Sequence, residues 1–89
     1  MMSNQMPDAN SIELEFLRAE LATGLTFSKI ALEARHASKV ERNRVNARRA
    51  YDTVRHFAPG TSLSAEEALE IDSRTAQLKS ALQQLGEDV

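Results

Sequence analysis

Glycine and proline are scarce in this chain, which limits the number of tight turns that it can form. The 89 residues contain three Gly and two Pro. A sheet of several strands needs many turns, and these two residue types supply most of them. Helix-forming residues are abundant instead, with 13 Ala and 10 Leu against four Val and three Ile. We therefore expect an all-α fold with few and short connections.

The length and the residue types present also limit the function. Eighty-nine residues allow one domain with a thin core. The absence of Cys excludes a disulfide scaffold, a thiolate zinc site and a thiol nucleophile. The sequence has no Gly-rich phosphate loop, no HExxH helix and no Ser-centred nucleophile elbow. We therefore expect neither an enzyme nor a protein that holds a metal ion or a cofactor.

Cap residues divide the chain into three predicted helices, over residues 11–35, 39–57 and 65–85. Ser38 is followed three residues later by Glu41, and Ser64 by Glu67, which is the pattern of a capping box at a helix start. Pro59-Gly60 separates the second helix from the third, and Gly86 is placed to end the third. We expect a disordered lead over residues 1–9, a domain over 10–86 whose first helix is capped by Asn10, and a tail over 87–89.

Apolar residues recur at helical spacing in all three segments, and their arrangement predicts an antiparallel three-helix bundle. The first helix carries two apolar stripes, so we expect it to contact both other helices, which carry one stripe each. The residues expected at the centre of the core are Leu21, Leu25, Tyr51, Val54, Leu78 and Leu82. The two stripes of the first helix are Leu14, Leu17, Leu21, Leu25 and Leu32, and Ile12, Phe16, Phe27, Ile30 and Ala34. The stripe of the second helix is Val40, Ala47, Ala50, Tyr51, Val54 and Phe57.

The second helix has an unusual charge. Between Arg35 and His56 there are seven Lys or Arg and two acids, whereas the residues before and after this segment are net acidic. By helical geometry, Arg42, Arg49 and His56 lie within about 40° of one another, opposite the apolar stripe. Arg44, Arg48 and Arg55 flank the stripe and can reach acids on neighbouring helices. These six residues are the candidate interaction residues.

Part of the second helix resembles a known family of interaction modules. The pattern Ala47-x-x-x-Tyr51-x-x-Val54-x-x-x-x-Pro59 resembles the second helix of a tetratricopeptide repeat, and Gly24 with Phe27 resembles its first helix. The three-helix outline is also similar to microtubule-interacting-and-transport domains, which are bundles that bind helical peptides. The resemblance implies a small helical interaction module.

We therefore expect a protein–protein interaction module that accepts a helical or extended peptide in a groove between two helices. Self-association remains open, because repeat-like helices often stack on copies of themselves. The alternative is a nucleic-acid or phosphate site on the Arg-rich second helix. Nucleic acid is not the expected partner, because the chain has a net charge of −2 and no aromatic residue stands among the outward Arg.

The expected location is the cytoplasm. The first ten residues are polar, contain no Lys or Arg and lack an apolar run, so they do not resemble a signal peptide. No stretch approaches the roughly 18 apolar residues that a membrane-spanning helix needs. We therefore expect no contact with a membrane.

Overall fold

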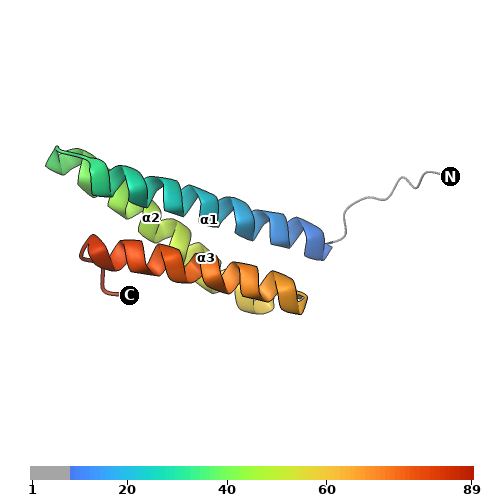
Figure 1. Cartoon of the computed structure of the whole chain (residues 1–89). Coiled ribbons are helices and arrows are strands. Elements are labelled where there is room, and N and C mark those ends of the chain that lie inside the picture. The colour runs from blue at the N-terminus through green and yellow to red at the C-terminus, as the bar shows by residue number, and fades with distance from the viewer. Residues whose placement is uncertain (1–8) are drawn as a thin grey trace.

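Three helices form an antiparallel bundle. The computed structural model describes residues 9–89, with side chains from Ser11 onward. The elements are α1 (Ala9–Glu33), α2 (Ala37–Phe57), a short 3-10 turn η1 (Ala58–Gly60) and α3 (Ala65–Gln84). In Figure 1 the chain reverses direction between α1 and α2 and again between α2 and α3, so α1 and α3 run the same way. The prediction of an all-α three-helix bundle is confirmed.

The helix bounds differ from the predicted ones by one or two residues. Helix α1 begins at Ala9 and ends at Glu33, each two residues before the predicted position. The predicted lead over residues 1–9 lies outside the described residues except for Ala9, which is helical. The side chain of Asn10, the predicted cap, also lies outside the described part of the chain.

The predicted cap of α2 is wrong. Ser38 lies inside the helix, and His36, with extended backbone (φ −106°, ψ 132°), occupies the N-cap without a side-chain hydrogen bond. The carboxylate of Glu41, which a capping box would require, instead accepts hydrogen bonds from Arg44 one turn further on. The Glu41 side chain, which the sequence pattern assigned to the cap, is thus in a local ion pair with Arg44.

Both predicted ends of α3 are confirmed. The Oγ of Ser64 accepts from the backbone N–H of Glu67 at 3.1 Å, and the Glu67 carboxylate accepts from the N–H of Ser64 at 2.9 Å. At the other end Gly86 has a φ of +91°, a conformation that favours glycine. The N–H of Glu87 donates to the carbonyl of Leu82 at 2.9 Å, which closes a Schellman turn.

The core side of α1 follows a heptad pattern, because its buried positions alternate in steps of three and four residues. In α1 these positions change from Leu14, Leu17 and Leu21 to the small residues Gly24, Ser28 and Ala31. A Cβ added at Gly24 would lie 3.0 Å from the Cβ of Ala50 and 2.7 Å from the Cδ2 of Leu78. Glycine here lets all three helices approach closely, because a Cβ would press against Ala50 and force the Leu78 side chain to shift. The buried apolar positions of α2 and α3 are Ala47, Ala50, Tyr51, Val54, Ile71, Leu78 and Leu82.

Five of the six residues expected at the core centre are buried, and Leu25 is half-buried. The two predicted stripes of α1 are not buried along their full length. Leu32 in the first, and Ile12 and Phe16 in the second, are exposed. Phe57, on the predicted stripe of α2, is exposed as well. Ile12, Phe16 and Phe57 therefore lie uncovered at the end of the bundle where α1 begins and α2 ends.

Candidate interaction surface

The arginines of α2 separate into two groups by position. Arg44, Arg48 and Arg55 lie on the flank that faces α3, which we call the inner flank. Arg42 and Arg49 lie on the outward side of α2, opposite its apolar stripe, and we call this pair, whose spacing His56 continues, the cationic row. The row is exposed, whereas Arg44 and Arg48 are half-buried.

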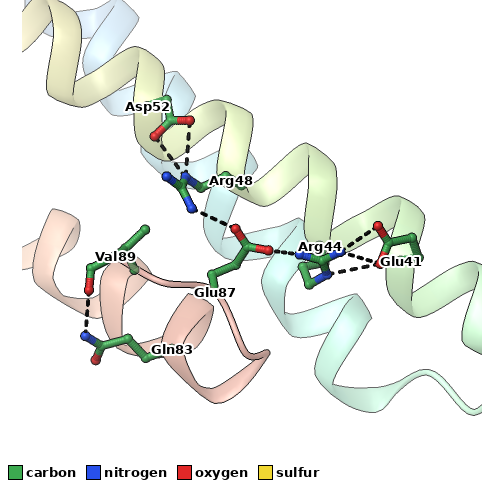
Figure 2. A network of polar contacts seen from close by, with 7 residues as sticks. All are labelled: Glu41, Arg44, Arg48, Asp52, Gln83, Glu87 and Val89. Atoms are coloured by element: carbon green, nitrogen blue, oxygen red, sulfur yellow. Dashed lines mark hydrogen bonds and ion pairs between the residues drawn. The ribbon is translucent and has the colours of Figure 1, made fainter.

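Two arginines of the inner flank share one carboxylate that follows α3. Figure 2 shows Glu87 between Arg44 and Arg48, with one carboxylate oxygen toward each guanidinium. The Glu87 side chain is only 10% exposed, and its Oε1 lies 2.8 Å from the Nη1 of Arg48. The Schellman turn at Gly86 directs Glu87 back toward α2. The predicted tail over residues 87–89 therefore joins the bundle, and Val89 packs against the core.

The remaining contacts of the inner flank join residues within α2. Asp52 accepts from the Nε of Arg48 at 3.0 Å. Arg44 lowers the pKa of the Glu41 carboxyl, because it donates hydrogen bonds to the charged form. Arg55 donates to the hydroxyl of Tyr51 at 2.9 Å, and its guanidinium carbon lies 5.7 Å from the centroid of the Tyr51 ring. All three predicted flanking arginines are therefore held in contacts within the bundle.

Helices α1 and α3 are joined by a separate ion pair. Arg18 donates two parallel hydrogen bonds to Glu70, at 2.9 and 2.8 Å, in the bidentate geometry that guanidinium and carboxylate groups favour. These bonds lower the pKa of Glu70 and raise the pKa of Arg18. Glu15 and Arg74 extend the pair along the two helices.

The cationic row has no such partners. Neither Arg42 nor Arg49 forms an ion pair with any carboxylate whose side chain the structure describes. The row residues are spaced seven apart along α2, so helical geometry places them one above another on one side. A shallow hollow of about 460 Å³ lies beside the row and is lined by Arg49, His56, Val45 and Phe57, among others.

An aromatic groove adjoins the row where α2 ends. Phe16 of α1 and Phe57 of α2 meet edge to face with ring centroids 5.7 Å apart, and His56 meets Phe57 in the same way at 4.7 Å. Ile12, Phe16 and Phe57 are 59%, 41% and 51% exposed, although apolar side chains gain by burial. Together with Leu17, Gly60 and Thr61, among others, these residues line a hollow of about 420 Å³. We call this hollow the aromatic groove.

Sequence analysis missed the aromatic groove, because Ile12, Phe16 and Phe57 were assigned to buried stripes. The relevant sequence feature is that Phe57 is the last residue before the Ala58-Pro59-Gly60 break, so no further turn of α2 covers Ile12 and Phe16.

A third hollow, of about 410 Å³, lies between α2 and α3 and is lined by Leu63, Ile71 and Asp72, among others.

Comparisons with known proteins return no match among family models, curated proteins or solved structures. The resemblance to tetratricopeptide and microtubule-interacting-and-transport modules therefore stays a prediction. Among residues 9–89 there is no helix long and apolar enough to cross a membrane. The same residues contain no cluster of three or more His, Cys, Asp or Glu side chains arranged to hold a metal ion.

Proposed function

We propose that this chain is a small protein–protein interaction module, and that the aromatic groove receives an apolar segment of its partner. The proposal is carried by one observation: the Phe16 ring of α1 contacts the Phe57 ring of α2, and both side chains are exposed. Aromatic side chains contribute strongly to interfaces, because they supply a large rigid area at a low cost in conformational entropy. An isolated exposed Leu such as Leu69, on α3, has no comparable neighbour and needs no functional explanation.

The rigidity of the groove supports this proposal. Leu17 forms its floor and is fully buried, so one wall belongs to the core of the bundle. The other wall is the end of α2 with His56 and Phe57, and η1 continues the chain from there with Gly60 in the lining. A binding surface supported by packed helices needs little reorganisation when a partner arrives, which favours affinity.

The alternative function is nucleic-acid or phosphate binding by the cationic row. The absence of ion pairs at Arg42 and Arg49 favours it, but the chain has a net charge of −2, and the exposed Val45 and Phe57 that line the hollow beside Arg49 offer nothing to a phosphate backbone. We expect no retardation of DNA or RNA by micromolar protein at about 150 mM salt. Retardation that is lost in an Arg42→Gln/Arg49→Gln variant would favour the alternative.

Selection of binders from a displayed library of helical and extended peptides tests the proposed function. We expect enriched peptides to bind the parent chain and to lose binding to the Phe16→Ser/Phe57→Ser variant. Leu69→Ser is the matched control, since it removes an exposed apolar side chain outside the groove. Thermal melts would verify that both variants fold. Peptides that bind the Phe16/Phe57 variant as well as the parent would contradict the proposal.

A further inference from the structure

We infer that the partner of the aromatic groove is an acidic amphipathic helix, and that its carboxylates lie along the cationic row. This inference rests on the proposed function and adds the chemistry of the partner. It starts from the contrast between the arginines with ion-pair partners and those without.

The cationic row stands out because most other arginines of the chain are occupied. Arg18, Arg44, Arg48 and Arg74 each form an ion pair, and Arg55 is bonded to Tyr51. Arg42 and Arg49 have no carboxylate partner within the described part of the chain, and Arg35, which lies a further seven residues before Arg42, has none either. The two arginines of α2 left without an ion pair are therefore seven residues apart and lie on one side of that helix.

The spacing of the row matches a helix better than a strand. Residues seven apart on a helix lie about 10.5 Å apart along its axis. A partner helix that carries an acid every seventh residue repeats at the same distance, so each carboxylate meets one cation. In an extended peptide, side chains on one face recur about every 6.6 Å, which falls out of step with the row.

Apolar residues beside the row favour a protein over a nucleic acid. Val45 is 41% exposed and lines the same hollow as Arg49 and Phe57. The hollow shares His56 and Phe57 with the aromatic groove, so the two form one continuous surface. An amphipathic helix supplies apolar side chains for Val45 and Phe57 and carboxylates for Arg42 and Arg49. A phosphate backbone supplies only the charge.

A second copy of this chain is a poorer match than a separate partner. Its α1 carries Glu13 and Glu20 seven residues apart, but the next position in that series is Phe27. Glu20 is also half-buried, so its carboxylate is not free to reach across an interface. We therefore assign the row to a partner whose acidic face extends over more turns.

A pair of synthetic helical peptides tests the inference. Each has about 25 residues, long enough to lie along α2 at 1.5 Å per residue, with Leu for the groove. One carries Glu at every seventh position, and the other carries Gln there. We expect the Glu peptide to bind the full chain more tightly in a fluorescence anisotropy titration, with an affinity that falls between about 50 and 200 mM salt.

Variants locate the effect on the row. Arg42→Gln/Arg49→Gln should weaken the Glu peptide about fivefold, as expected for two exposed ion pairs, and leave the Gln peptide unchanged. Lys79→Gln, an exposed cation on α3, is the matched control and should change neither affinity. Phe16→Ser/Phe57→Ser should abolish the binding of both peptides.

The outcomes separate the two proposals. Equal binding of the Glu and Gln peptides, with binding lost in the Phe16/Phe57 variant, overturns the acidic helix and leaves the groove as the binding site. Binding of both peptides to the Phe16/Phe57 variant overturns the groove as well. An Arg42/Arg49-dependent shift of a DNA duplex, without binding of the Glu peptide, assigns the row to phosphate. Self-association detected by light scattering and lost in the same variant assigns the row to a second copy.

Discussion

On the inner flank of α2, Arg44 and Arg48 share the carboxylate of Glu87, whereas on the outward side Arg42 and Arg49 form no ion pair with any described carboxylate. All four arginines belong to one helix and are separated by no more than seven residues. The number of arginines in a helix therefore does not indicate their role. Their direction relative to neighbouring helices decides whether they stabilise the bundle or remain available to a partner.

Both flanks rest on one core, and the largest expected effect comes from breaking that core. Leu78 is fully buried and lies against Gly24. Leu78→Ala should lower the free energy of unfolding by about 2–5 kcal/mol, because it leaves a cavity where all three helices meet. A domain of this size has about 5 kcal/mol of stability, so the variant should keep at most about 3 kcal/mol and melt at a much lower temperature than the parent. A thermal melt that overlays the parent would show that α3 is not part of the core.

Substitutions of Ser64 and Ser38, the two predicted capping residues, should have smaller effects on the free energy of unfolding that differ from each other. Ser64→Ala removes a hydrogen bond to the N–H of Glu67 and should cost about 0.5–2 kcal/mol. Ser38→Ala should stay within about 0.5 kcal/mol of the parent, because Ser38 lies inside α2 rather than at its cap. Urea denaturation of the two variants checks the difference. Equal costs would move the start of α2 to Ser38.

A substitution at Glu87 tests whether the ion pairs of the inner flank stabilise the bundle. Glu87→Gln removes the carboxylate that Arg44 and Arg48 share, so two half-buried cations lose their common partner. The melting temperature should fall by a few degrees, and less so at high salt, where the parent's ion pairs are screened. Asp88→Asn removes a neighbouring exposed acid without a described partner and is the matched control. Equal melting temperatures for the two variants would mean that the Glu87 carboxylate contributes nothing to stability.

The paired acids also predict the effect of pH. Arg44 and Arg18 lower the pKa of Glu41 and Glu70, respectively, below the ordinary value of 4.5. A lowered folded pKa gives stability that is fully present above the unfolded value and is lost as pH falls through the folded value. Glu70→Gln should therefore lower the melting temperature at neutral pH and reduce the further loss in acid. A parallel loss in parent and variant below pH 4.5 would exclude Glu70 as a contributor.

The sequence predicted the features that depend on local spacing. The capping box at Ser64, the stop at Gly86 and five of the six central core residues follow from caps and heptads, which act within a few turns of one helix. Ser38 matched the same capping pattern, but α2 begins at Ala37, and the Glu41 carboxylate is paired with Arg44 one turn away. A capping motif alone therefore does not fix the first residue of a helix.

The features that sequence reasoning missed depend on where a neighbouring helix stops. Ile12 and Phe16 have the periodicity of a buried stripe, but α2 ends at Phe57 and covers them only in part. Glu87 was expected in a tail, and its contacts with α2 require the Schellman turn together with the packing of α3. The candidate arginines were correctly divided into two flanks, because helical geometry alone fixes their direction. Arg44 and Arg48 form ion pairs with Glu87 because the tertiary fold brings the end of α3 against α2, and local sequence spacing does not predict this.

The central claim is that the surface formed by the aromatic groove and the cationic row binds the partner, while the inner flank holds the bundle together. Titration of isotope-labelled protein with the acidic helical peptide, followed by NMR, tests this claim residue by residue. The account predicts shift changes at Ile12, Phe57 and Arg49, with Arg44, Arg48 and Glu87 unchanged. Changes centred on Arg44, Arg48 and the hollow between α2 and α3 would contradict it.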